Sequence, residues 1–127
     1  MKIHIYFQPL PADIYGAAIQ DREDHSKYFL FCDTAARSIQ QRRHTFGHEL
    51  AHILEGHFDT KDALTFYQDG ERKALFQNGE YIAPTGKPLD RNNHSEHSAD
   101  RNAWYYYRRF RDQFIQAEKT GRATITL

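Results

Sequence analysis

The sequence has few of the residues that cross-link or anchor a chain. Its one cysteine, Cys32, cannot form an internal disulfide, which suits a reducing compartment and predicts a small buried apolar residue. No apolar run approaches the length of a membrane span, and the apolar stretch from Met1 to Tyr6 is too short for a secretory signal. We therefore expect a cytoplasmic protein with no membrane partner.

An excess of charge of either sign is also absent. The 17 basic residues balance 17 acidic residues, so no global field gathers nucleic acid or anionic lipid. Four arginines, Arg101, Arg108, Arg109 and Arg111, surround the aromatic run from Tyr105 to Tyr107, and aromatic and basic side chains together can stack on bases and bind phosphates. The favoured interpretation of this segment is an apolar core face beside a solvated basic face, so nucleic acid is an unlikely partner.

Aromatic and histidine side chains are what the chain does have. Phe, Tyr and Trp make up 14% of 127 residues, so we expect one domain over residues 1–127 with a largely aromatic core. Eight histidines is a high number for this length. Histidine is the common zinc ligand and proton carrier near neutral pH, so the search for a site starts from these residues.

The residue pattern predicts an α+β fold. Strands are expected over Lys2 to Phe7, Ile14 to Ile19 and Tyr28 to Cys32, in a small antiparallel or mixed sheet. The strand from Tyr28 to Cys32 is a candidate sheet edge that would hold an extended peptide by backbone pairing. Asp69-Gly70 and Asn78-Gly79 are turn signals between further strand candidates.

Two long helices are expected to pack against this sheet. The first runs from Ala35 to about Glu55, with an N-cap at Asp33-Thr34, one buried apolar stripe and a left-handed stop at Gly56. The second begins near Ser95 and has apolar residues at spacings of three and four. It should end near Gly121 and leave a short tail.

The first helix carries the sequence His48-Glu49-Leu50-Ala51-His52. Because one turn takes 3.6 residues, His48 and His52 project from the same face and can bind one ion. Glu49 points about 100° around the helix, where a base can take a proton from water activated by the metal. The pattern predicts one Zn²⁺ per chain with Glu49 as the catalytic base. The alternative is a pair of surface histidines beside an ordinary glutamate.

A catalytic zinc site of this type needs a third protein ligand. Glu96 is the preferred candidate, because Asp100 follows it by one helical turn. Asp100 can then accept the free ring N–H of His48 or His52 and so fix its tautomer. Two histidines and one carboxylate also suit Mn²⁺ and Fe²⁺.

Other polar residues remain candidates for smaller roles. His57 follows the first helix, but it stands one residue short of the position that a longer three-histidine motif would need. His94 and His97 are alternative candidates for the third ligand, but neither comes with an acid placed as Asp100 is after Glu96. Together with Tyr81 and Tyr105 they are also candidates to contact substrate or to stabilise the oxyanion of a peptide-bond transition state.

The two motifs resemble those of the ImmA/IrrE-type metallopeptidases, a gluzincin-like family. The first motif is the run from Arg42 to His52, and the second is Glu96-x-x-Ala99-Asp100-x-x-Ala103. The resemblance covers roughly Tyr28 to Trp104. Asn102 differs from the family pattern, which usually has an aromatic residue there, and no added DNA-binding or sensor domain is present in these residues.

The resemblance implies a minimal zincin-like fold and a zinc-dependent endopeptidase. By the same resemblance His48, His52 and Glu96 would bind the metal and Glu49 would be the catalytic base. It also implies a protein substrate, such as a helix-turn-helix transcriptional repressor, in a phage or mobile-element setting. The sequence does not indicate an oligomeric state.

A metal-containing protein-binding or sensor module without proteolytic activity is the alternative function. A purely structural zinc site is usually closed by four protein ligands, whereas only three residues have a good case here. The variant Glu49→Gln separates the two functions, because it should abolish cleavage and leave partner binding intact.

Overall fold

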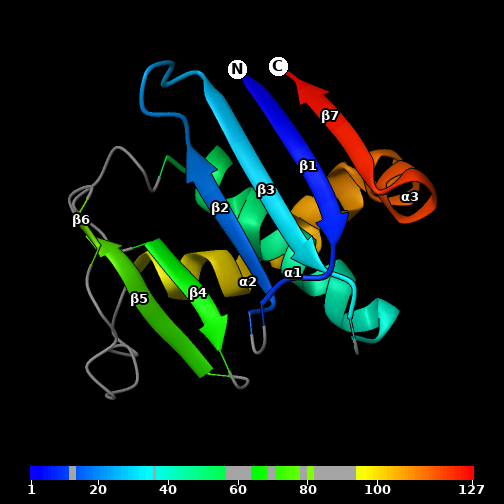
Figure 1. Cartoon of the computed structure of the whole chain (residues 1–127), viewed down its shortest axis with the longest axis horizontal. Helices are drawn as coiled ribbons and strands as arrows, with labels where there is room; N and C mark the ends of the chain where they lie inside the picture. The colour runs from blue at the N-terminus through cyan, green and yellow to red at the C-terminus, as the bar shows by residue number, and fades with distance from the viewer. Residues whose placement is uncertain (12–13, 36, 57–63, 69–70, 78–79, 82–93) are drawn as a thin grey trace.

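Seven strands and three helices form the described part of the chain, and their arrangement is α+β, as the sequence predicted (Figure 1). The computed structural model describes residues 1–127 apart from 12–13, 36, 57–63, 69–70, 78–79 and 82–93, and it describes side chains outside residues 57–97. In this part of the chain, every helix is too short or too polar to cross a membrane.

A mixed four-stranded sheet, in the order β2-β3-β1-β7, forms one layer of the protein. It contains β1 (Lys2–Gln8), β2 (Gly16–Gln20), β3 (Lys27–Asp33) and β7 (Arg122–Thr126). β1 pairs parallel with β3 and antiparallel with β7, while β2 pairs antiparallel with β3. The expected tail after Gly121 is therefore wrong, because those residues complete the sheet.

The position of β3 also contradicts its predicted role as a sheet edge. β3 lies between β2 and β1 and bonds to both, so its backbone groups are used inside the sheet. An extended peptide cannot pair with a strand whose two sides are already occupied. The interpretation of β3 as a peptide-binding edge is therefore wrong.

A second sheet contains β4 (Leu64–Gln68), β5 (Glu71–Gln77) and β6 (Glu80–Tyr81), paired antiparallel in that order. The chain passes from β4 to β5 through residues 69–70 and from β5 to β6 through residues 78–79. These are the two places where the sequence predicted turns, although the four turn residues themselves lie outside the described residues. The strand pairing agrees with the two predicted hairpins.

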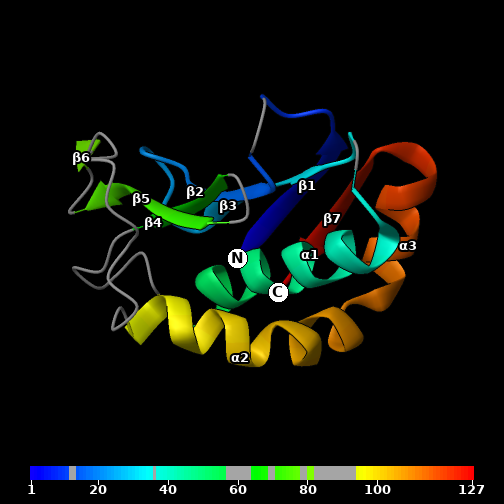
Figure 2. The same cartoon turned by 90° about the horizontal axis from the view of Figure 1, so that it is seen from below.

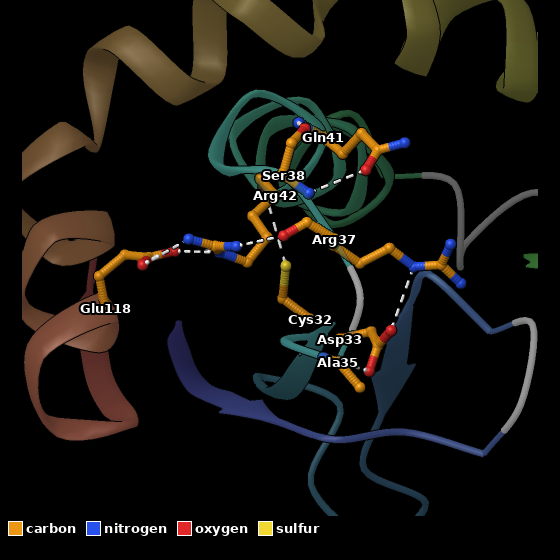
Figure 3. A network of polar contacts seen from close by, with 8 residues as sticks. All are labelled: Cys32, Asp33, Ala35, Arg37, Ser38, Gln41, Arg42 and Glu118. Atoms are coloured by element: carbon orange, nitrogen blue, oxygen red, sulfur yellow. Dashed lines mark hydrogen bonds and ion pairs between the residues drawn. The ribbon is translucent and has the colours of Figure 1, made fainter.

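Helix α1 (Ile39–Leu54) begins later than the sequence predicted. Its N-cap is Ser38, whose side chain accepts a hydrogen bond from the Gln41 N–H while the Gln41 side chain accepts from the Ser38 N–H. The expected N-cap at Asp33-Thr34 is wrong, because the Asp33 carboxylate has other partners. It accepts the Ala35 N–H at 3.1 Å and pairs with Arg37 at 3.1 Å (Figure 3). The helix ends at Leu54, Glu55 is its C-cap, and Gly56 follows with the predicted positive φ, 72°.

Arg42 ties the first turns of α1 to helix α3 (Arg111–Thr120). Its guanidinium donates to both oxygens of Glu118, at 2.6 and 3.0 Å, and to the Arg37 carbonyl at 2.6 Å (Figure 3). The hydrogen bond to Glu118 is the main cause that raises the pKa of Arg42. This bidentate pair fixes the end of α1 that lies farthest from His52.

The predicted second long helix is two helices, α2 (His94–Arg109) and α3. They meet at Phe110, whose φ of −114° and ψ of 30° depart from helical values. The break lets the two helices pack on different surfaces. α2 packs along α1, whereas α3 packs against β1 and β7. A straight helix could not cover both surfaces. α3 ends at Gly121, as predicted, with a φ of 83°.

Helix α1 lies between the four-stranded sheet and α2, so the fold has three layers (Figure 2). All residues of α1 from Thr45 to Ile53 are buried. The expectation of a single buried stripe is wrong, because the sheet covers one side of α1 and α2 covers the other. This central position removes His48, Glu49 and His52 from solvent.

The core between the sheet and the helices is aromatic, as the composition predicted. The rings of Phe7, Phe46 and Phe114 meet edge to face, with centroids 5.4 to 6.0 Å apart. Cys32 belongs to the same core with 0% of its surface exposed, and burial raises the pKa of its thiol. Cys32 is therefore the buried apolar residue that the sequence predicted.

Candidate metal centre

The ring nitrogens of His48 and His52 converge in the C-terminal half of α1. The two residues are 0% and 1% exposed, and their Nε2 atoms lie 3.0 Å apart. Helical spacing accounts for the shared face, and Asp100 of α2 contacts the His48 ring. Two imidazole nitrogens at this separation can bind one metal ion with little movement of either ring.

Asp100 of α2 fixes the orientation of the His48 ring. Its Oδ1 lies 2.8 Å from His48 Nδ1, and a carboxylate can only accept at this position. Nδ1 therefore carries the proton, and the lone pair of His48 Nε2 faces His52. Of the two histidines that the sequence offered to Asp100, the structure places His48 against it.

The spacing of the two nitrogens suits a bound zinc ion. Two nitrogens about 2.0–2.1 Å from one ion at a tetrahedral angle would lie about 3.3 Å apart. The observed 3.0 Å differs by a few tenths of an ångström, which a small rotation of either ring supplies. The donor types, the tautomer of His48 and the burial of both rings all fit this metal.

Glu49 lies on the next face of α1, toward strand β2. It is 0% exposed, and a Cβ added to Gly16 at the start of β2 would lie 3.4 Å from Glu49 Cγ. The same added carbon would come within 2.4 Å of Thr45 Cγ2 and 2.9 Å of the Phe31 carbonyl oxygen. Gly16 therefore lets β2 approach the helix directly over Glu49, beside the histidine pair.

The predicted third ligand lies on α2 close to Asp100 in sequence. Glu96 belongs to the first turn of this helix, one turn before Asp100, and its side chain falls outside the described residues. The side chains of His94, His97 and Tyr81 are likewise outside them, as is all of His57. Among the described side chains, no three His, Cys, Asp or Glu groups gather as a ligand set. The assignment of Glu96 as a ligand stays a prediction.

Tyr105 is not brought toward the histidine pair. Its side chain is 55% exposed, and it follows Ala103 by two residues, which is about 200° around the helix. Ala103 faces α1, so Tyr105 points away from it. The neighbouring arginines, Arg101, Arg108, Arg109 and Arg111, are exposed, whereas the intervening Tyr107 is buried. This distribution agrees with a core face beside a solvated basic face.

Two contacts between α1 and α2 were not foreseen from the sequence. At Gly47 the helices touch so closely that an added Cβ would lie 1.8 Å from the Ala103 carbonyl oxygen. At Glu55 the carboxylate accepts hydrogen bonds from three residues of α2. Small residues four apart on both helices, Gly47 with Ala51 and Ala99 with Ala103, are the signal that could have indicated the close approach.

Comparisons with known proteins give no independent assignment: no family model matches the chain, and no curated protein and no solved structure matches it either.

Proposed function

We propose that this protein is a zinc-dependent endopeptidase of the ImmA/IrrE type, with a minimal zincin-like fold. The observation that carries the proposal is the buried pair of Nε2 atoms 3.0 Å apart, with Asp100 on the far nitrogen of His48. Glu49 lies on the adjoining face of the same helix. Chance placement of two surface histidines would not bury both rings and give one of them an acid partner.

His48, His52 and Glu96 are the residues proposed to hold the metal. A bound Zn²⁺ would supply a Lewis acid for the scissile carbonyl and lower the pKa of water at the site. Asp100 keeps the proton on His48 Nδ1, so that Nε2 remains available as a ligand. The same ligand types accept Mn²⁺ or Fe²⁺.

Glu49 is the proposed general base. Its carboxylate accepts the proton of the attacking water and returns it to the nitrogen of the leaving amine. The position of α1 between two layers buries this carboxylate on the same helix as the histidine pair. Glu49→Gln keeps the size of the side chain but removes its ability to take a proton.

The proposed substrate is a protein, with a helix-turn-helix transcriptional repressor as the leading class. The support is the resemblance of the two motifs to those of the metallopeptidase family. A flexible loop in such a repressor would present an extended peptide to the site. The proposed setting is the cytoplasm of a cell that carries a phage or mobile element.

Elemental analysis of purified protein tests whether the chain binds zinc through Glu96. Glu96→Ala removes the proposed ligand, and Glu23→Ala, at an exposed glutamate, is the matched control. We expect about one zinc per chain in wild type and in Glu23→Ala, and most of it lost in Glu96→Ala. Zinc retained by Glu96→Ala would move the third ligand to another residue. No zinc in any of the three, even after zinc is added, would remove the basis of the proposal.

Sequencing of new protein N-termini in cells tests proteolysis. New termini should appear in cells that produce wild type and be absent from cells that produce Glu49→Gln at the same level. If the two proteins give the same termini and both bind zinc, the function is that of a metal-containing binding or sensor module instead.

A further inference from the structure

Glu55, at the C-terminal end of α1, gathers hydrogen bonds from three successive turns of α2. Ser98 Oγ donates to Oε1 at 2.6 Å, while Asn102 Nδ2 and Tyr106 OH donate to Oε2 at 2.7 and 3.1 Å. The three donors lie four residues apart, on one stripe of the helix. Both oxygens of one half-buried carboxylate are thus used to hold the neighbouring helix.

These contacts fix the position of α2 along α1. A slip of α2 by one turn would move each donor by about 5.4 Å and bring the next residue of the stripe into its place. Because Ser98, Asn102 and Tyr106 have side chains of different length, the three hydrogen bonds could not all form again in the shifted register. The second fixed point is the close contact of Gly47 with the Ala103 backbone. The two helices run antiparallel (Figure 2). On α1, His48 lies between Gly47 and Glu55, and on α2 its partner Asp100 lies within the stretch from Ser98 to Tyr106 that Glu55 contacts.

We propose that Glu55 is a positioning residue for the metal centre: it holds α2 in the register at which Asp100 reaches His48 Nδ1. The metal part of this inference rests on the proposed function, whereas the placement of Asp100 does not. On this assignment Glu55 acts through the helix and not as a metal ligand.

The donors on α2 are suited to a permanent contact. The pKa of Tyr106 is raised to about 12, first by burial and then by the charge of Glu55, so its hydroxyl remains a donor at every physiological pH. Asn102 is also a donor at all pH values. Asn102 stands where the resembling family usually has an aromatic residue, and Glu55 gives a physical reason for an amide at this position.

Proton NMR of the metal-free protein tests the proposal directly. The Nδ1 proton of His48, bonded to a carboxylate, should give a strongly downfield resonance, and its loss in Asp100→Asn assigns it. We expect Glu55→Ala to broaden or shift this resonance. Glu55→Gln should largely keep it, because an amide oxygen can still accept from Asn102 and Tyr106. Glu118→Ala is the matched control, since it removes a two-oxygen acid contact at the opposite end of α1.

Zinc affinity, measured by competition with a chromophoric chelator, is the second readout. Glu55→Ala should weaken zinc binding by about tenfold, the lower end for residues that support a ligand, and Glu118→Ala by less than about twofold. An unchanged His48 resonance in folded Glu55→Ala, or equal effects of Glu55→Ala and Glu118→Ala, would overturn the positioning role. If wild type binds no zinc, the proposed function fails, while the resonance still decides the role of Glu55.

Discussion

Gly47 is the position where one added methyl group should do most damage. A Cβ at residue 47 would lie 1.8 Å from the carbonyl oxygen of Ala103 and 2.6 Å from its carbonyl carbon. These are backbone atoms of α2, so no side-chain rotation can relieve the contact. Carbon atoms in proteins approach carbonyl oxygens to about 3.3 Å, so Gly47→Ala must move the helices apart by about 1.5 Å at this point.

The next residue along α1 is His48, and its contact with Asp100 should be lost. The 2.8 Å hydrogen bond would lengthen beyond 3.5 Å if α2 moves as a rigid body. Overpacking costs about 1–3 kcal/mol and the loss of a hydrogen bond to a charged group about 1.5–3 kcal/mol. The better helix propensity of alanine offsets about 1 kcal/mol. We expect a net loss of about 2–5 kcal/mol in the free energy of unfolding.

Urea denaturation and zinc competition measure the two consequences of Gly47→Ala. The midpoint should fall and zinc binding should weaken together. The double variant Gly47→Ala/Ala103→Gly should not recover either quantity, because the clash is with the backbone of residue 103 and not with its methyl group. A Gly47→Ala protein that is more stable than wild type and binds zinc equally well would refute the close helix contact.

Three further predictions concern the rest of the fold. Ser38→Ala should lower the free energy of unfolding by about 1 kcal/mol in urea, whereas Thr34→Ala should change it little, because Ser38 caps α1. Cys32 should not react with a thiol reagent until urea unfolds the protein, because it is buried and its thiol pKa is raised. Hydrogen bonds from the Asp24 and Glu23 N–H groups lower the pKa of Asp21 in the folded protein. The ionised Asp21 carboxylate therefore stabilises the fold above its unfolded pKa, and this stabilisation is lost as the pH falls through the lower folded pKa. The difference in the free energy of unfolding between wild type and Asp21→Asn should therefore be constant above about pH 4 and shrink as the pH falls below it.

Local patterns in the sequence were sufficient for most of the elements. Aromatic and β-branched runs predicted β1 and β3, and the end of α1 at Gly56 followed from the left-handed conformation that glycine adopts. The α1 start was misjudged because Asp33 and Ser38 are both good capping residues. Asp33 is instead used by Arg37 and by backbone N–H groups outside the helix.

The sequence alone determined that His48 and His52 share one face of a helix with Glu49 beside them, because helical geometry depends only on spacing. It also predicted that Asp100 on the second helical segment would accept the ring N–H of either His48 or His52. Tertiary packing decided the rest: α1 is buried on both sides, α2 breaks at Phe110, and Asp100 meets His48 from 52 residues away. Such contacts depend on how layers stack and how closely two backbones approach, and no periodicity within a single segment encodes them.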